Sequence, residues 1–222
     1  MKPWPFIDEG RCPPDLAMER DRALFTAVRE GLLPGFLRFY AWSRPAVTVG
    51  HHQAGFRPAT PGLDLPVLAR PTGGGAVLHL DDITFSLAST APSPLPVGVE
   101  ECSLLVSGVF AQAFRACGID AELCGGTHAF SHVCFQRSSP VELRCGATKI
   151  LGIALRRRGG ATLVQGVVPL RVDSRLAAGV FGPLAASGMR GILDLQSDFD
   201  AAAFTGLVRQ GIASTLGVTI GA

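Results

Sequence analysis

Residues 70–79 read Arg70-Pro71-Thr72-Gly73-Gly74-Gly75-Ala76-Val77-Leu78-His79, and they are the most informative stretch of the sequence. An apolar run over residues 65–69 precedes it and is short enough for one buried strand. Over residues 83–88, apolar Ile83, Phe85 and Leu87 alternate with small or polar residues, which is the period of a half-buried strand. The sequence therefore predicts a glycine loop between two strands.

Three consecutive glycines leave this loop without side chains. Glycine permits positive φ, and it lets a ligand lie directly against main-chain N–H groups. A plain glycine-rich hairpin is the alternative, but a fixed cation at Arg70 and a titratable ring at His79 bracket the glycines and favour a binding site. A P-loop is not predicted, because no Gly-Lys-Ser/Thr follows, and the G-x-G-x-x-G spacing of dinucleotide sites is also missing.

The composition is that of an ordinary globular protein, with 222 residues, 47% hydrophobic and 17% charged. This length predicts a single domain over residues 1–222. The net charge of +2 gives no basis for a nucleic-acid partner, and we expect neither a signal peptide nor a membrane span. We therefore expect a cytoplasmic protein whose six cysteines are reduced, and without a C-x-x-C spacing no zinc site is predicted.

Strands outnumber helices in the remaining pattern and are mostly adjacent in sequence, which predicts an α+β fold with a mainly antiparallel sheet and helices packed on it. A helix that is capped near Asp15 and ends at Gly31 is expected first. Residues 124–140 are expected to form a mobile loop, and adjacent His51 and His52 are expected at a pocket rim or exposed. Further helices are predicted over residues 102–117 and 204–212, and strands over residues 36–42, 46–49, 141–145, 149–155 and 161–170.

A second candidate site combines Cys134, in the polar segment, with Lys149 in a Gly146-x-x-Lys149-x-x-Gly152 setting. A lysine near a loop cysteine lowers the thiol pKa and makes the sulfur nucleophilic. Spacing alone leaves open the alternative that Cys134 is a small apolar core residue and Lys149 a surface charge. The triplet Arg156–Arg158 is typical of a solvated hairpin end, and it could also meet an acidic partner.

Four segments together resemble the lipoate-protein ligase/biotin-protein ligase catalytic superfamily. Within it, the likeness is greatest to the ligase-like octanoyl-carrier-protein:protein octanoyltransferases. The segments are Trp4–Asp8 with Leu16–Met18, Phe39–Trp42 with Val49–Gln53, Arg70–His79 with Thr84–Ser86, and Cys134–Phe135 with Glu142–Leu143 and Gly146–Ala154.

The resemblance implies a mixed sheet with helices on one side and an acyl tunnel under the glycine loop. By position, Cys134 would be the acyl-accepting nucleophile, and Lys149 would contact the acyl carbonyl. An octanoyl or lipoyl group would pass from octanoyl acyl carrier protein to a lysine of a lipoyl-domain protein, without a cofactor, a metal or a membrane. The substrate-binding residues would be Arg70, Thr72, Gly73, Gly74, Gly75, Ala76, Val77, His79, Gly152 and Ala154.

Three departures from that pattern leave other functions open. Leu155 stands where glutamine is usual, Gln165-Gly166-Val167 stands where His-Gly-Ser or His-Gly-Thr is usual, and an accessory C-terminal domain is not expected. One alternative is an ATP-dependent lipoate-protein ligase of the same fold, with ATP and lipoate as substrates and with Arg70 and Arg156–Arg158 serving phosphates. The other is a non-catalytic acyl- or biotinyl-binding homologue.

Overall fold

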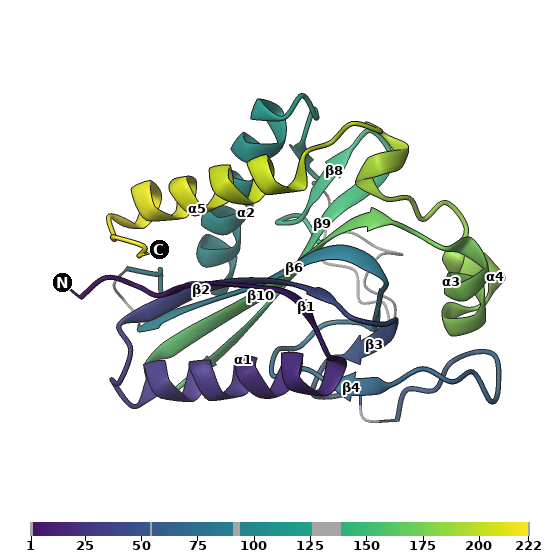
Figure 1. The fold of residues 1–222 in the computed structure, drawn as a ribbon, viewed down its shortest axis with the longest axis horizontal. Coiled ribbons are helices and arrows are strands. Elements are labelled where there is room, and N and C mark those ends of the chain that lie inside the picture. Colours follow the sequence, from purple (N-terminus) through teal and green to yellow (C-terminus); the bar gives the residue numbers. More distant parts are fainter. Residues whose placement is uncertain (1, 54, 91–93, 126–138, 222) are drawn as a thin grey trace.

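A seven-stranded sheet forms the centre of the fold (Figure 1), in a computed structural model that describes residues 2–53, 55–90, 94–125 and 139–221. The strand order is β1-β2-β6-β10-β9-β8-β7, and every pair except parallel β1–β2 is antiparallel. The strands are β1 (Phe6–Cys12), β2 (Gly35–Trp42), β6 (Asp81–Thr90), β7 (Glu122–Leu123), β8 (Leu143–Cys145), β9 (Thr148–Arg158) and β10 (Ala161–Arg171).

A second, three-stranded sheet has the order β4-β3-β5 and carries the glycine loop between β4 and β5. Its strands are β3 (Ala46–Val49), β4 (Val67–Ala69) and β5 (Val77–His79). Together the two sheets confirm the predicted α+β class with mainly antiparallel pairing. The helices are α1 (Pro14–Arg29), α2 (Val99–Ala116), α3 (Ser174–Phe181), α4 (Pro183–Ala186) and α5 (Ala201–Leu216), with a 3-10 turn over Ile192–Asp194.

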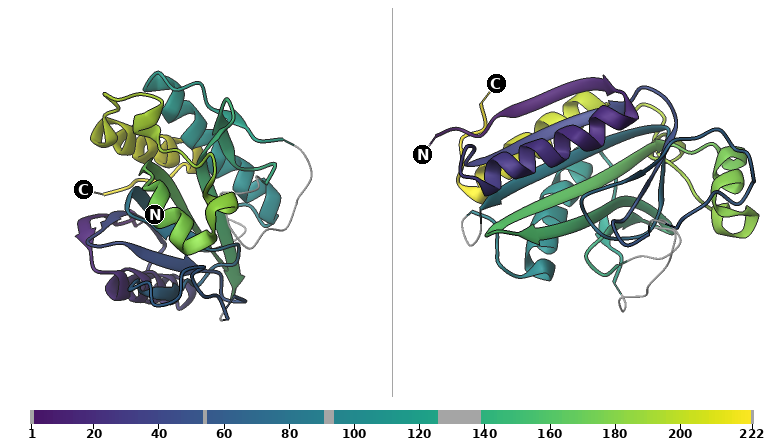
Figure 2. Two further views of the ribbon diagram at one scale, coloured as in Figure 1. Left: turned by 90° about the vertical axis from the view of Figure 1, so that its right-hand side faces the viewer. Right: turned by 90° about the horizontal axis from the view of Figure 1, so that it is seen from below.

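Helices cover both faces of the large sheet (Figures 1 and 2), so the expectation of helices on one side is wrong. Strand β2 shows why, because it presents large apolar side chains in both directions. Leu37 and Phe39 join the core beneath α2 and α5, whereas Phe36 packs with Phe25 and Val28 of α1. Neither face of this strand could be left in water, and α1 together with the small sheet covers the second one.

Aromatic rings fill the space between the sheet and the α2–α5 pair. Phe85 of β6 stacks on Phe110 of α2 with ring centroids 4.5 Å apart, and Phe204 of α5 lies 4.5 Å from Phe114. All four side chains are fully buried. The residues predicted to face inward on β6 and on the last helix therefore meet in one core.

The other face of β6 is also buried, contrary to the prediction of a half-buried strand. Thr84 and Ser86 point to the α1 side, where they are at most 4% exposed. Alternation of polar and apolar residues normally marks a water-facing side. Here the polar side contacts further buried polar groups, which form part of the site described below.

Helix α1 differs from its prediction at its N-terminus and along its buried stripe. It begins at Pro14 after Pro13, no side chain caps it, and Leu16 is 41% exposed. Ala17, Phe25 and Val28 are buried as helical spacing requires, but the position between them is the fully buried carboxylate of Asp21. A charge on the apolar stripe of a helix needs a partner inside the protein.

Arg38 of β2 is that partner. Its Nη1 donates to Asp21 Oδ1 at 2.5 Å, and its Nη2 donates to Glu9 Oε2 at 2.5 Å. Desolvation disfavours the charge on Arg38, but the carboxylates of Asp21 and Glu9 outweigh it and raise the pKa of the guanidinium. Burial likewise opposes ionisation of Glu9, yet hydrogen bonds from Arg38 and Arg20 lower the pKa of its carboxyl below the usual value. Arg38 and Glu9 are therefore charged at neutral pH.

The two ends of the described chain meet at the edge of the sheet. Trp4 pairs with Ile220 in a parallel bridge, with Trp4 N–H donating to Thr219 O at 2.8 Å and Gly221 N–H to Trp4 O at 2.8 Å. The Trp4 indole is 2% exposed and lies against Gly35, where a Cβ would come within 2.3 Å of the ring. The segment before β1 is thus hydrogen-bonded to the segment after α5.

Five of the six cysteines lie in the described part of the chain, where all five are free thiols. Burial raises the pKa of Cys102 to about 11, consistent with the predicted core position on its helix. Cys117, also expected in the core, is only partly buried. None of the described helices combines the length and apolar character of a membrane span, and no cluster of metal-ligating side chains occurs among the described residues.

Replacing Arg38 by methionine should destabilise the protein by about 3–5 kcal/mol, because it leaves Asp21 and Glu9 as buried carboxylates without their cation. The measurement is the free energy of unfolding in urea. Arg20→Met is the matched control, since Arg20 also pairs with Glu9 Oε2, at 2.9 Å, but its side chain is 49% exposed. That variant should lose much less stability, because an exposed ion pair contributes little. Equal losses for the two variants would contradict a special role for the buried pair.

Candidate active site

The glycine loop is fixed in place by Arg70. Its Nε donates to Gly73 O at 3.0 Å, Nη2 donates to Gly73 O at 2.5 Å and to Gly75 O at 2.8 Å, and Nη1 donates to Thr48 O at 3.2 Å. Only 6% of Arg70 is exposed. The guanidinium thus gathers carbonyl oxygens on one side of the loop, and this holds the loop in one shape.

The loop also lies flat against the end of β3. Gly74 has a φ of +90°, as the prediction of positive φ required, and its carbonyl oxygen approaches Gly50 so closely that a Cβ there would be 2.3 Å away. His51 N–H donates to Thr72 O at 3.1 Å, which closes the contact. At Gly73, in contrast, an added Cβ would meet nothing within 4 Å. The loop glycines therefore serve different purposes.

Beneath the loop is a small pocket with a cavity volume of about 40 Å³. Its floor comes from adjacent strands, with Gly152 and Ala154 of β9 beside Gln165 and Gly166 of β10. Five of the ten predicted substrate-binding residues line it. They are Arg70, Val77, His79, Gly152 and Ala154, and the other lining residues are Met18, Tyr40, Trp42, Thr48, Thr84, Ile153, Gln165, Gly166 and Val167.

His79 forms part of the wall and uses both ring nitrogens inside the protein. Nδ1 lies 2.9 Å from Asp82 Oδ2, and because a carboxylate only accepts, this nitrogen carries a proton. Nε2 lies 2.9 Å from the Thr48 hydroxyl, and the ring stacks on Trp42 at 4.2 Å. The imidazole is 3% exposed. These contacts orient His79 as a fixed surface of the pocket.

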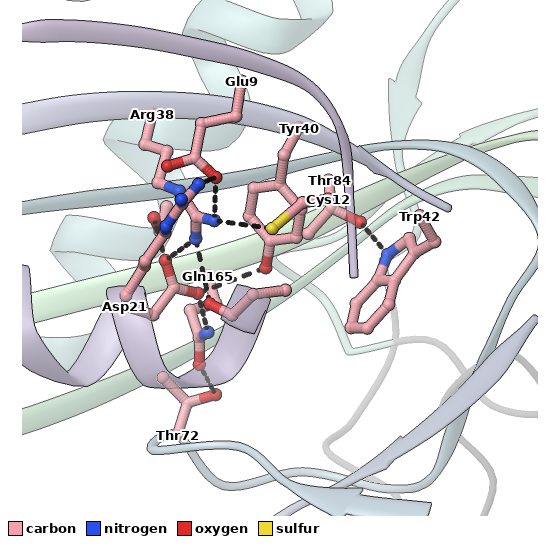
Figure 3. Close-up of polar contacts among 12 residues, drawn as sticks. Glu9, Cys12, Asp21, Arg38, Tyr40, Trp42, Thr72, Thr84 and Gln165 are labelled. Atoms are coloured by element: carbon pink, nitrogen blue, oxygen red, sulfur yellow. Dashed lines mark hydrogen bonds and ion pairs between the residues drawn. The ribbon is translucent and has the colours of Figure 1, made fainter. Parts of the chain in front are cut away.

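Gln165 connects the pocket floor to the buried Arg38–Asp21 pair (Figure 3). Its Nε2 donates to Asp21 Oδ2 at 2.5 Å, and its Oε1 accepts from the Thr72 hydroxyl at 2.8 Å. Ser86 Oγ donates to the same Asp21 carboxylate at 2.6 Å, and so does the Tyr40 hydroxyl at 3.2 Å. Burial and the Asp21 charge raise the pKa of Tyr40 well above its ordinary value, so the phenol remains a donor. The amide of Gln165 has partners on both sides.

Lys149 lies on β9, three residues before Gly152, and contacts Glu142. Its Nζ is 2.7 Å from Glu142 Oε2, and both side chains are 5% exposed. The same carboxylate oxygen accepts the Ser139 N–H at 2.7 Å. The structure therefore brings together Glu142 and Lys149, which both belong to the last of the four segments that carry the family resemblance. Their contact lies beside Ser139, the first described residue after the gap at residues 126–138. Cys134 lies outside the described residues. The same is true of the predicted mobile loop, apart from residues 124–125 and 139–140 at its two ends.

A second, outer cleft adjoins the pocket. Its cavity volume is about 390 Å³, and it shares Ile153 and Ala154 with the pocket wall, while Gly73 and Gly74 line it from the loop side. Ser139 also lines this cleft. A ligand chain in the inner pocket therefore has an adjacent space beside the segment that follows Cys134 in sequence.

The remaining predicted contacts are distributed around the loop. Thr72 is bound to Gln165, Gly75 supplies a carbonyl to Arg70, and Ala76 faces a different hollow on the α3 side. Sequence reasoning missed Tyr40, Trp42 and Asp21 as parts of the site. Asp21 had a detectable signal, because a lone carboxylate interrupts the apolar stripe of its helix.

Gly50→Ala should lower the free energy of unfolding by about 1–3 kcal/mol, because the new methyl group must push away the Gly74 carbonyl. Thermal and urea denaturation measure this loss. Gly73→Ala is the matched control, since its methyl group enters open space, and we expect a change within about 0.5 kcal/mol. A stable Gly50→Ala protein would show that the loop is not held against β3.

Comparison with known proteins identifies the family. Residues 13–210 match the family described as lipoyl protein ligase A/B catalytic domain. The chain is 33% identical to octanoyltransferase LipM of Geobacillus kaustophilus over 192 residues, which is 80% of this chain and 69% of that protein. It is 32% identical to octanoyltransferase LipM of Moorella thermoacetica over 180 residues, 77% of this chain and 66% of that protein. It thus spans about two thirds of the length of these relatives.

Solved structures agree in fold. A putative lipoate protein ligase from T. acidophilum superposes with a TM-score of 0.80 at 21% identity, covering 100% of this chain and 88% of that one. A lipoate-protein ligase A bound with ATP gives a TM-score of 0.79 at 21% identity, with the same coverage. The family match over most of the sequence and the shared fold lead to one conclusion: this chain belongs to the lipoyl protein ligase A/B catalytic domain family.

Proposed function

We propose that this protein is an octanoyltransferase, which moves an octanoyl group from an acyl carrier protein thioester to a lysine of a lipoyl-domain protein through an acyl-enzyme on Cys134. The nature of the acyl group is supported by the relatives named octanoyltransferase LipM. The geometry adds the observation that carries the proposal. A buried pocket under the glycine loop adjoins an outer cleft lined by Ser139, five residues after Cys134.

The pocket suits a saturated chain. Its walls include the apolar side chains of Met18, Trp42, Val77, Ile153 and Val167, and its polar lining groups are mostly engaged by protein partners. An apolar chain gains free energy in such a site without leaving buried polar groups unpaired. Octanoyl and lipoyl groups both meet this requirement, so the pocket supports the acyl class rather than one member of it.

In the first step, the Cys134 thiolate attacks the carbonyl carbon of the donor thioester. A carbon–sulfur bond forms to Cys134, the bond to the carrier sulfur breaks, and the carrier leaves as a thiolate that takes a proton. In the second step, the neutral amine of the acceptor lysine attacks the same carbon, the nitrogen releases a proton to water as the amide forms, and Cys134 leaves as a thiolate. Dividing the reaction in this way avoids direct attack of an amine on the donor.

Lys149 fits the role of an electrostatic stabiliser in both steps. An ammonium beside the reacting carbon stabilises the thiolate and the developing oxyanion. Glu142 holds the Lys149 ammonium at 2.7 Å in a buried pair, which limits the positions the side chain can take. Among the described cysteines, burial raises the pKa of Cys12, Cys102 and Cys117, and this argues against those thiols as the nucleophile.

A thiol nucleophile needs a reducing compartment, and we therefore keep the cytoplasm as the proposed location. No cofactor is needed for transfer between a thioester and an amine. The alternative, an ATP-dependent lipoate-protein ligase, is represented among the fold neighbours. It would require ATP and pass through an acyl-adenylate, so the two functions differ in what they consume.

Incubation with octanoyl carrier protein alone should leave one octanoyl thioester on the enzyme, because the first step needs no acceptor. Intact mass spectrometry detects the adduct, hydroxylamine should remove it, and peptide mapping should locate it on Cys134. Cys134→Ala should form no adduct and transfer nothing to a lipoyl domain. Cys145→Ala, at a described thiol of the neighbouring β8, is the matched control and should retain both.

Two results would count against this proposal. Transfer by the Cys134→Ala variant at the wild-type rate would exclude the acyl-enzyme. Dependence on ATP with free octanoate or lipoate, together with tolerance of Cys134→Ala, would identify the ligase alternative. A protein that binds the acyl group but supports neither reaction would be the non-catalytic homologue.

Lys149→Arg should keep the buried charge opposite Glu142 yet lower kcat by about 100-fold, because a planar guanidinium cannot reproduce the position of a compact ammonium. Single-turnover formation of the acyl-enzyme measures the effect, and thermal denaturation verifies folding. Lys2→Arg, an exposed lysine near the N-terminus, is the matched control. Normal turnover of Lys149→Arg would show that the reaction does not need the ammonium of Lys149.

A further inference from the structure

Besides Arg70, four arginines line a further cleft beside Pro71 of the glycine-loop segment. Arg22 and Arg29 come from α1, and Arg156 and Arg158 come from β9. The cleft has a cavity volume of about 280 Å³, and we call it the arginine cleft. Residues seven apart on a helix and two apart on a strand share a face, so both pairs point into it together.

Arg22, Arg29, Arg156 and Arg158 bring positive charge to the arginine cleft, and no ion-pair partner for them occurs among the described residues. Arg29 lies in the last turn of α1, where the helix dipole favours a cation. This accounts for one arginine of the four. Like charges gathered in a concave surface raise the local potential and attract an anion.

Two of the guanidinium groups are fixed at the cleft by main-chain oxygens, one at the end of β4 and one in the glycine-loop segment that follows it. Arg22 donates to Ala69 O, and Arg156 donates to Pro71 O at 2.7 Å. Each bond engages one nitrogen and leaves other N–H groups for a ligand. Arg29 packs against the β9–β10 turn, where its Nε is buried without a hydrogen-bond partner among the described residues and lies 3.2 Å from the Cβ position of Gly159.

Position relates the cleft to the acyl site. Strand β9 places Gly152 and Ala154 in the acyl pocket and continues to Arg156 and Arg158 in the cleft. At ~3.4 Å per residue, Ala154 and Arg158 lie roughly 14 Å apart along the strand. A carrier-bound acyl thioester has a long flexible arm beyond its sulfur, and that arm ends in a phosphodiester. Guanidinium forks bind phosphate oxygens in pairs.

Resting on the proposed function, we propose that the arginine cleft binds the phosphate of the acyl donor's pantetheine arm. The occupant is thus a phosphate group linked to the thioester, and not a carboxylate of the acceptor. Nucleotide phosphates have the same chemistry, so the test separates the two sources of phosphate.

The test compares octanoyl phosphopantetheine with octanoyl pantetheine as donors in acyl-enzyme formation. In the wild-type enzyme, the phosphorylated donor should have a KM lower by about tenfold, the ratio expected from one net charge-assisted contact. In Arg29→Gln/Arg158→Gln this advantage should disappear, while kcat and the KM of octanoyl pantetheine stay unchanged. Arg44→Gln/Arg175→Gln, which removes two exposed arginines outside the cleft, should keep the full advantage.

Equal KM values for the two donors in the wild-type enzyme would overturn the proposal, and so would an advantage that survives in Arg29→Gln/Arg158→Gln. If the double variant fails to fold by thermal denaturation, Arg158→Gln alone provides the same comparison. If neither donor reacts but ATP and octanoate do, the octanoyltransferase function is wrong. In that case a KM for ATP that rises in the double variant would support a phosphate site for nucleotide, and an unchanged KM would exclude a phosphate site altogether.

Discussion

The buried pair of Arg38 and Asp21 is the contact on which most of the structure depends. It joins the second strand to the first helix, and through Glu9 it reaches the first strand. Removing two charges from water costs several kcal/mol per ion, so such a pair is weak support for stability in itself. Its value lies in position, because this packing of α1 against the sheet brings Asp21 within hydrogen-bond distance of donors on three strands, namely Arg38, Ser86 and Gln165. The Arg38 guanidinium also lies 3.9 Å from the centre of the Tyr40 ring, which fixes a pocket wall.

The same carboxylate extends this control to the acyl pocket. Asp21 accepts from Ser86 and Gln165, and Gln165 in turn accepts from Thr72 in the glycine loop. The path from core to loop therefore consists of short hydrogen bonds between buried groups. A glutamine can accept on one side and donate on the other, which a neutral histidine can also do with different geometry. With glutamine at position 165, both the nitrogen and the oxygen of the side-chain amide therefore have hydrogen-bond partners at the floor of the pocket.

Sequence patterns located the strands better than they predicted which faces of the strands are buried. Residues 46–49 form a strand as expected, and all four of its residues are buried. The prediction of a half-buried strand failed for β6. Alternation in β6 suggested a water-facing side, yet Ser86 meets Asp21 in the interior. The short helices α3 and α4 were not predicted, because eight and four residues contain too few turns to show a helical repeat.

The candidate site was predicted in outline by its motifs and less well in its contacts. Pairing of Glu142 with Lys149 follows from neighbouring strands, because Arg144 is opposite Lys149 in the β8–β9 register. The role of Arg70 differs from the predicted one. A cation before three glycines suggests a ligand contact, whereas its donors largely hold loop carbonyls. Which oxygen atoms turn toward a guanidinium depends on loop dihedral angles that residue type alone does not fix.

The bridge between Trp4 and Ile220 has a consequence for the order of events during synthesis. All of the large sheet lies between Trp4 and Ile220 in sequence, so the indole lacks this neighbour until the whole intervening chain has been synthesised. Domains begin to fold while they are being made, and contacts distant in sequence form late. A nascent chain of this protein therefore carries an unpaired Trp4 segment beside the sheet until Ile220 has emerged.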